Sequence, residues 1–209
     1  MFAPGAGRLL VPSAVVTVAL GAWAWWLPAG VARHAVLGVF AAALTVTGFL
    51  AWFFRDPERA PGEGIVSAAD GRVLAVAERD GRWQVAVFMN VTDVHVNRFP
   101  LDAIVETVED GGAGFRPAYA PDAEHNVRRH YRLSTLLGPV EVVQMTGVAA
   151  RRLVSLVRIG EQRRKGDRLG MIILGSRVDV FLPRDRTRVV VHPGARVRAG
   201  VTTIAQAIP

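Results

Sequence analysis

Hydrophobic residues divide the chain into two parts with different patterns. Residues 9–27 and residues 35–54 form two uncharged, mainly apolar runs, separated by a short segment that contains Pro28, Gly30 and Arg33. Each run has about 20 residues, and a helix of that length, rising about 1.5 Å per residue, matches the roughly 30 Å hydrocarbon core of a bilayer. The pattern predicts an N-terminal hairpin of two helices over residues 1–54, either transmembrane or monotopic.

The tryptophans of this segment favour a membrane location, because indole rings gather at the interface between lipid and water. Four of them are expected to cluster toward one end of the hairpin: Trp23, Trp25, Trp26 and Trp52. A cleaved signal peptide is the alternative, but its apolar core is usually shorter and is not followed by a second apolar run. Arg55 and Arg59 follow the second run, so the positive-inside rule favours a cell-membrane protein whose main domain is cytoplasmic.

After residue 60 the hydrophobic pattern changes to short alternating segments, separated by Gly, Pro and Asp. Alternation with a period of two is typical of strands with one buried face. The segments with this pattern are residues 71–78, 83–90, 103–109, 140–147, 154–159, 171–183, 187–193 and 202–208. They predict a mainly β (α+β) domain over residues 55–209, a sandwich or barrel with one or two short helices.

Two segments of this domain are similar to each other. Residues 164–173 and residues 192–205 each place glycine in a turn, follow it with alternating basic and apolar residues, and reach a second glycine before a strand. The pattern resembles the hammerhead turns of biotinyl and lipoyl domains, and predicts a barrel-sandwich, lipoyl-like architecture. No lysine stands at the tip of a matching hairpin to carry a prosthetic group, so the resemblance is architectural.

Composition narrows the possible chemistry. The 209 residues include no cysteine, which excludes disulfides, thiolate nucleophiles and cysteine-ligated metals, so any nucleophile must be an oxygen or a nitrogen. The formal net charge is +7, and only two of the 25 basic residues and none of the 18 acidic residues precede residue 55. A basic domain of this kind suits anionic lipid or nucleic acid.

A polar cluster closes the predicted strand at residues 83–90. The six residues 93–98 contain four polar side chains, namely Asp93, His95, Asn97 and Arg98. On a strand His95 and Asn97 would point the same way, because side chains repeat every second residue. A lone histidine usually only completes a hydrogen-bond network, but a polar cluster at a strand end is a common place for function.

Two further segments carry candidate residues. Asp70 precedes Gly71 at a strand entry, where an Asp-Gly pair is also an ordinary turn signal. Residues 121–132 are basic, and Arg128 among them could hold a phosphate because guanidinium offers paired donors to oxyanions, although a solvated basic loop is the simpler interpretation. The two histidines of this segment are five residues apart without an agreed third ligand, so no metal site is predicted.

The segment at residues 171–183 contains Gly175 and Ser176, where a strand would favour branched side chains. A serine hydroxyl can attack the carbonyl of the preceding residue if the backbone bends and a base removes the proton; glycine permits that bend because it has no Cβ. The attack converts the amide to an ester, whose elimination and hydrolysis would leave a pyruvoyl group and a cut chain. An inert serine in a strand is the ordinary alternative.

Six motifs in matching order give the chain a resemblance to phosphatidylserine decarboxylase, in the short form found in bacteria and archaea. The similarity runs from about residue 53 to the C-terminus, roughly three quarters of the chain. The motifs are FFRDPER, ADGRV, DVHVNR, MTGVAARRLV, KGDRLGMI and GSRVDVFLP.

The resemblance implies that the proenzyme cleaves itself between Gly175 and Ser176, giving a β chain of residues 1–175 and an α chain of residues 176–209 that form a heterodimer or a higher oligomer. Ser176 would become a covalent pyruvoyl group, form a Schiff base with the serine amine of phosphatidylserine and accept electrons as CO2 leaves, giving phosphatidylethanolamine. The implied partners are an anionic phospholipid and the membrane, without nucleic acid.

Family members use an Asp-His-Ser arrangement for self-cleavage, which the resemblance carries over to Asp70, His95 and Ser176. Longer relatives have two histidines three residues apart in this motif, whereas here Arg98 stands at the second position. We therefore expect His95 to serve both self-cleavage and decarboxylation. The residues expected to bind substrate are Asn97, Arg98 and Arg128.

Three alternatives stay open. A serine hydrolase could use Ser176, His95 and Asp70 without self-cleavage, although LGSRV lacks the second glycine of a G-x-S-x-G turn. A non-enzymatic, membrane-anchored lipoyl-like adaptor would leave these residues unexplained. Within the family, the substrate could be a related serine-headed lipid such as archaetidylserine.

Overall fold

The computed structural model describes residues 1–148, 152–173 and 176–208. The chain forms two compact units, Met1–Pro57 and Glu58–Pro209, which are called the hairpin unit and the β unit and are described separately. Gly175, which supplies the carbonyl of the predicted cleavage bond, lies outside the described residues, whereas Ser176 lies within them.

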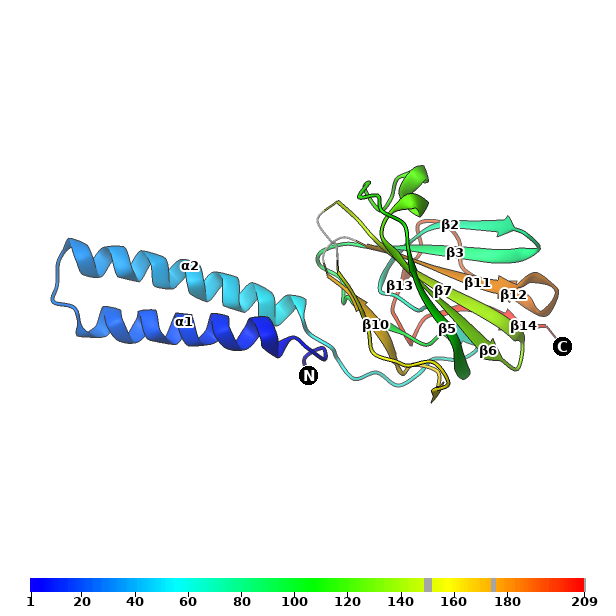
Figure 1. The fold of residues 1–209 in the computed structure, drawn as a ribbon, viewed down its shortest axis with the longest axis horizontal. Coiled ribbons are helices and arrows are strands. Elements are labelled where there is room, and N and C mark those ends of the chain that lie inside the picture. Colours follow the sequence, from blue (N-terminus) through cyan, green and yellow to red (C-terminus); the bar gives the residue numbers. More distant parts are fainter. Residues whose placement is uncertain (149–151, 174–175, 209) are drawn as a thin grey trace. The chain divides into compact units, whose positions relative to one another are not determined.

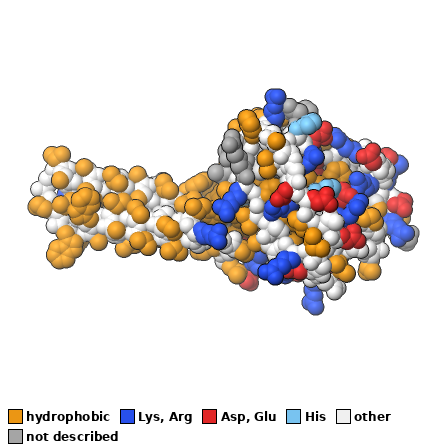
Figure 2. Space-filling view, viewed as in Figure 1, with side chains coloured by type: hydrophobic (Ala, Val, Ile, Leu, Met, Phe, Trp, Pro, Cys, Tyr) orange, Lys and Arg blue, Asp and Glu red, His pale blue; other side chains and the backbone are white. Residues whose placement is uncertain are grey.

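The hairpin unit consists of two antiparallel helices, α1 (Gly7–Trp26) and α2 (Val31–Phe53) (Figure 1). Thr17 and Thr47 share a hydrogen bond of 3.0 Å between the helices, and Gly21 lets the ring of Phe40 pack against α1. In each helix only 11% of the most apolar 18-residue segment is buried. The visible side chains of this unit are mostly hydrophobic (Figure 2). Both helices are long and apolar enough to cross a bilayer.

The prediction that the tryptophans cluster at one end of the hairpin is wrong. Trp23, Trp25 and Trp26 occupy the last turn of α1, beside the connection to α2, whereas Trp52 lies in the last turn of α2. In an antiparallel pair these turns lie at opposite ends. Trp52 accordingly lies near the start of the chain, where Phe2 pairs with Arg55. Each end of the hairpin therefore carries indole rings.

The β unit is mainly β, as predicted, and its described residues form one large antiparallel sheet and two small sheets. The large sheet is strongly curved, and its strands lie in the order β13-β2-β3-β11-β7-β6-β5-β9 (Figure 1). Its strands are β2 (Gly71–Arg79), β3 (Arg82–Met89), β5 (Ala103–Gly111), β6 (Arg128–Thr135), β7 (Gly138–Thr146), β9 (Gln162–Arg163), β11 (Ser176–Pro183) and β13 (Arg196–Val197).

The small sheets have the orders β1-β14-β12 and β4-β10-β8. Their strands are β1 (Ile65–Val66), β14 (Thr203–Ala207), β12 (Thr187–Val189), β4 (Val96–Arg98), β10 (Arg168–Ile172) and β8 (Leu153–Ser155). Two short 3-10 helices, η1 (Pro121–His125) and η2 (Arg184–Arg186), complete the described elements.

The segment predicted as one strand at residues 171–183 is divided between two sheets. Ile172 ends β10 and pairs with Leu153 of β8, whereas Ser176 begins β11 in the large sheet. Residues 171–174 are all apolar and lead directly to Gly175 and Ser176, so the sequence alone does not reveal the change of partner. Ser176 is thus the first described residue of β11, and its partners differ from those of Ile172.

The two glycine-turn segments lie against each other. A Cβ on Gly200 would lie 3.4 Å from the Cα of Gly166 and 3.0 Å from the Cδ of Arg98, and both glycines have positive φ angles, of 75° and 86°. This contact agrees with the similarity between the two segments. The finer comparison with biotinyl and lipoyl domains stays a prediction.

The two faces of the large sheet differ in chemistry. The inner face carries buried apolar side chains such as Val87, Val142 and Val180. On the outer face burial raises the pKa of Asp179, although Arg177 donates hydrogen bonds of 2.7 and 2.8 Å to its carboxylate. Burial also opposes ionisation of the outer-face residue Glu141, but hydrogen bonds from Arg82 and His130 outweigh it and lower the pKa. The outer-face carboxylates of Asp179 and Glu141 are therefore bound in ion pairs.

Candidate active site

Ser176 lies on the inner face of the large sheet, at the start of its central strand β11. It pairs with Met89 of β3 on one side and Thr146 of β7 on the other, and its exposed fraction is 0%. Its hydroxyl donates to the sulfur of Met89 at 3.4 Å. Because Ser176 is in phase with Val178 and Val180, it continues an apolar row with a hydroxyl group.

Asn97 is brought to the same place by β4. Its amide nitrogen donates to the sulfur of Met89 at 3.5 Å, so that one methionine touches both Asn97 and Ser176. The Asn97 carbonyl oxygen accepts a 2.7 Å hydrogen bond from Gln144, whose own oxygen accepts from the Tyr131 hydroxyl at 3.2 Å. All these side chains are buried, and the chain of contacts fixes the orientation of Asn97.

Gly170 makes room for these polar contacts. A Cβ at this position would lie 2.9 Å from both the Gln144 amide nitrogen and the Tyr131 hydroxyl, and 2.7 Å from the carbonyl oxygen of Val154. Backbone oxygens do not yield to such an approach, so a side chain at residue 170 would displace the groups that hold Asn97.

His95 is held in a defined tautomer by the turn before β4. Its exposed fraction is 1%, and Nδ1 lies 2.9 Å from the backbone carbonyl oxygen of Asp93. A carbonyl oxygen can only accept a hydrogen bond, so Nδ1 carries the proton and Nε2 of the neutral ring is the basic nitrogen. The His95 carbonyl oxygen in turn accepts from the amide of Ile172 at the end of β10.

Asp70 forms a nearly buried ion pair with Arg59. The two guanidinium nitrogens lie 2.5 and 2.8 Å from the two carboxylate oxygens, and the Ala199 amide donates a further hydrogen bond of 2.7 Å. Together these bonds use most of the roughly four acceptor positions of a carboxylate. Among the described residues, Asp70 therefore bonds to Arg59 and Ala199 rather than to His95.

The predicted site residues are thus brought together only in part. Ser176 and Asn97 share Met89, and His95 precedes Asn97 by two residues. Asp70 is linked to them by the next residue, Gly71, because a Cβ added to Gly71 would lie 3.3 Å from the Cα of Met89.

The two predicted arginines contact backbone carbonyl groups elsewhere. Arg98 is buried and donates to the carbonyl oxygen of Gly166 at 2.9 Å, on the side of β4 opposite Asn97. Arg128 donates to the carbonyl oxygen of Glu124. Their part in substrate binding stays a prediction.

Sequence reasoning missed three residues of the site: Met89, Gln144 and Tyr131. Gln144 had a recognisable signal, because it continues the inward-facing row of Val140 and Val142 with a polar side chain. A buried amide needs hydrogen-bond partners, so such a position predicts a polar network, although not its members.

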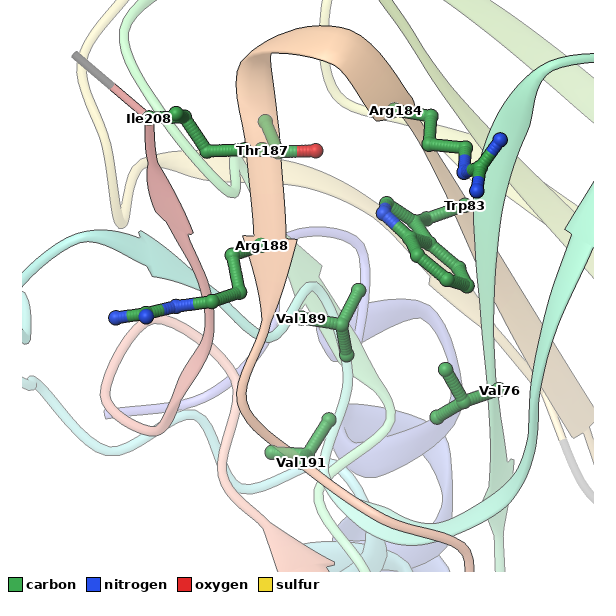
Figure 3. Close-up of a pocket in the computed structure, with 8 residues that line it drawn as sticks. All are labelled: Val76, Trp83, Arg184, Thr187, Arg188, Val189, Val191 and Ile208. Carbon is green, nitrogen blue, oxygen red and sulfur yellow. The ribbon is translucent and has the colours of Figure 1, made fainter.

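A separate groove of about 350 Å³ lies at the other end of the sheet (Figure 3). Val76, Val189 and Val191 point into it, the Trp83 indole lies beside Arg184, and Arg188 extends away from it. Trp83 pairs with Leu182, six residues along β11 from Ser176, so this groove is distant from the serine.

The fold and the site together define a class of protein, namely a β domain with an apolar helical hairpin, a fully buried serine on its central strand and a buried histidine of fixed tautomer. Comparisons with known proteins agree on a family. The family model of phosphatidylserine decarboxylase matches residues 46–205.

Named relatives cover nearly the whole chain. A phosphatidylserine decarboxylase proenzyme of Streptomyces griseus is 42% identical over 201 residues, which are 90% of this chain and 93% of the relative. One of Thermobifida fusca is 40% identical over 215 residues, 96% of each chain. A protein of Halobacterium salinarum, whose name refers to an archaetidylserine decarboxylase proenzyme, is 45% identical over 90% of this chain and all of its own. The chain belongs to the phosphatidylserine decarboxylase family.

Proposed function

We propose that this chain is a proenzyme that cleaves itself between Gly175 and Ser176 and then converts phosphatidylserine to phosphatidylethanolamine and CO2. The observation that carries the proposal is the position of Ser176, which is buried on the central strand β11 and shares Met89 with Asn97, two residues after His95. A serine hydrolase would need an exposed nucleophile, and the exposed fraction of Ser176 is 0%.

Self-cleavage requires a base that takes the proton of the attacking hydroxyl group. The Ser176 hydroxyl attacks the carbonyl carbon of Gly175, His95 Nε2 takes its proton, and the amide becomes an ester. Elimination then breaks the Cβ–Oγ bond, which leaves a carboxylate on Gly175 and dehydroalanine at residue 176. Water hydrolyses the imine tautomer of this residue and releases ammonia, so a pyruvoyl group remains at the start of the α chain.

The surroundings of Ser176 fit that group. A pyruvoyl group keeps the Cα, Cβ and carbonyl of the serine and loses its nitrogen, so it needs no more space than the buried residue it replaces. The Asn97 amide lies within reach of Met89 and could orient a ketone oxygen. When bound to the substrate amine, the group supplies an electron sink for the pair released with CO2.

The residues of this chain then have two tasks in decarboxylation. The buried, apolar inner face keeps water away from the substrate carboxylate, which favours its loss. His95, whose Nδ1 proton is fixed by Asp93, returns a proton to the carbon that has lost CO2.

The two chains would remain together after cleavage. The α chain contributes β11, which lies between β3 and β7 of the β chain with eight and six paired residues. It also contributes β13 and β14, which pair with β2 and β1. A central strand with partners on both sides does not separate without unfolding the sheet, so the product is a heterodimer.

Archaetidylserine is a second candidate substrate, because the Halobacterium salinarum relative is as similar as the bacterial ones. The two lipids share the serine headgroup and differ in the chains attached to glycerol. Rates of CO2 release from diacyl and ether lipids of equal headgroup would distinguish them.

The hairpin is proposed to span the membrane, with the β unit on the cytoplasmic side. Each helix is about 30 Å long at 1.5 Å per residue, and indole rings stand at both ends. The end that joins the β unit carries Arg8 and Arg55, against Arg33 at the far end, which agrees with the positive-inside rule. A basic surface adds about 1 kcal/mol of attraction to anionic lipid per nearby cation.

Cysteine labelling tests this topology, because the chain contains no cysteine of its own. Ala29→Cys, in the exposed connection between the helices, should react with a membrane-impermeant maleimide added to intact cells. Leu136→Cys, at a position 96% exposed in the β unit, should react only after permeabilisation. Protection of Ala29→Cys in intact cells would show instead that the hairpin stays in one leaflet or has the opposite orientation.

Denaturing mass spectrometry of the purified protein tests the proposed function. Two fragments should replace the 22.6 kDa chain. The smaller should begin at residue 176 and be lighter by one ammonia than a fragment beginning with serine. The same preparation should release CO2 from phosphatidylserine. A single intact chain without this activity would contradict the proposal.

A further inference from the structure

Two arginines face each other at the end of the large sheet where Ser176 lies. Arg72 of β2 and Arg196 of β13 are register partners, so their side chains lie on the same face of this strand pair. Like charges directly opposite each other destabilise a strand pair. An anion bound between Arg72 and Arg196 would therefore reduce this repulsion and stabilise the strand pair.

The protein supplies only part of that negative charge. One guanidinium nitrogen of Arg196 lies 3.4 Å from the carboxylate of Asp93, and the Arg196 side chain is 71% exposed. Arg72 donates to the carbonyl oxygen of Gly194 at 3.2 Å and has no acidic partner among the described residues. One positive charge at this place is thus not balanced by a carboxylate.

The two arginines line a pocket of about 280 Å³, called here the arginine pocket. Its other lining residues are Gly71, Phe88, Asn90, Thr92 and Asp93. The volume is slightly below the roughly 300–1,000 Å³ of most small-molecule sites. It suits a polar headgroup and is too small for the acyl chains of a lipid.

The arginine pocket adjoins the candidate active site. Arg72 pairs with Phe88, and the next residue of β3 is Met89, which contacts the Ser176 hydroxyl. Strands lie about 4.8 Å apart, so Arg72 and Ser176, on strands either side of β3, are roughly 10 Å apart. The pocket residue Asp93 also holds the ring of His95 through its carbonyl oxygen.

Strand alternation places Arg72 on the outer face and Ser176 on the inner face. However, β3 ends at Met89, and residues 90–95 turn there, so a headgroup would pass over the strand end rather than through the sheet. In a serine-headed phospholipid only one oxygen and two carbons separate the phosphorus from the amine nitrogen. One headgroup can therefore place its phosphate near the long side chains of the two arginines and direct its amine toward Ser176.

We propose that the arginine pocket binds the phosphodiester of the serine-headed lipid through Arg72 and Arg196. This inference rests on the proposed function and adds to it the group by which the headgroup is held. Guanidinium groups provide the paired, charged donors that phosphate oxygens accept. The pocket would thereby favour phosphatidylserine over free serine, which lacks the phosphate.

Kinetics with a soluble, short-chain phosphatidylserine below its micelle concentration test the proposal without a membrane surface. Arg72→Gln and Arg196→Gln should each raise KM about ten- to a hundredfold, the usual effect of losing a charged hydrogen bond, with a much smaller change in kcat. Arg72→Lys should retain part of the affinity. The matched control is Arg188→Gln, an exposed arginine that bonds to Gln206 and extends away from the groove at the other end of the sheet (Figure 3).

Intact mass, measured on the same samples, separates the possible failures. Normal self-cleavage together with raised KM supports the arginine pocket. Cleaved variants with KM within twofold of the unmodified enzyme, or raised only on phosphatidylserine vesicles and not with the soluble lipid, would overturn it and leave the proposed function standing. If Arg72→Gln fails to cleave, Arg196→Gln provides the same comparison. An unmodified enzyme that neither cleaves nor releases CO2 would contradict the proposed function itself.

Discussion

Replacing Ser176 with alanine is expected to leave the protein as one intact chain without decarboxylase activity. Alanine removes the oxygen that attacks the Gly175 carbonyl, and no cysteine is present to replace it. Without the ester there is no elimination and no pyruvoyl group, so the loss should be complete rather than partial. Denaturing mass spectrometry and CO2 release from phosphatidylserine measure the two consequences separately.

The fold of this variant should survive. Among the described residues, the Ser176 hydroxyl donates to the sulfur of Met89, a weak acceptor, so its removal should change the free energy of unfolding by less than about 1 kcal/mol. Ser134→Ala is a matched control, because Ser134 also lies in a strand, β6, and pairs with Pro139 at the end of β7 away from Ser176. Cleavage between residues 175 and 176 in Ser176→Ala, or activity in the uncut chain, would refute the proposed mechanism.

The hairpin and the strands of the β unit could be predicted because their signals are local. Two apolar runs of bilayer length are sufficient to indicate the helices, and alternation indicates most strands. The prediction of where the tryptophans gather was wrong because it depends on the direction of α2 relative to α1. Neither apolar run by itself shows that direction. The division of residues 171–183 was missed for a similar reason, since an apolar segment indicates extended chain but not the strands with which it pairs.

The candidate site shows the same limit. Motifs indicated Ser176, His95 and Asp70, but not the residues that hold them. Gln144 is 47 residues from Asn97 in the chain, and only the pairing of β7 with β11 and of β10 with β4 brings the two together. Likewise, no local pattern shows that Arg59 is the partner of Asp70.

The Arg59–Asp70 pair changes the interpretation of the aspartate. A carboxylate that is nearly buried and bonded to Arg59 and Ala199 organises the start of β2, where Gly71 packs on the backbone of Phe88 and Met89. Removing one partner of such a pair typically costs about 3–5 kcal/mol. Loss of cleavage in an Asp70 variant would therefore not identify a base, and His95 is the more decisive residue to change.

Replacing His95 with alanine is expected to impair both self-cleavage and decarboxylation. Because Nδ1 donates to the Asp93 carbonyl oxygen, Nε2 is the basic nitrogen and can accept the Ser176 proton. Loss of a positioned general base typically slows a reaction by about 10²–10⁴-fold. The rate at which intact chain disappears, followed by mass spectrometry from the time of synthesis, measures the effect on cleavage.

The second role is measured on whatever fraction of His95→Ala has been processed after long incubation. If His95 also returns the proton during decarboxylation, kcat per pyruvoyl group should be lowered by a similar factor, and added imidazole should restore part of both rates. His192→Ala is the matched control, since that exposed histidine also bonds to a backbone carbonyl oxygen through Nδ1. A processed His95→Ala with normal kcat would restrict His95 to self-cleavage, and a normal rate of processing would exclude it as the base for Ser176.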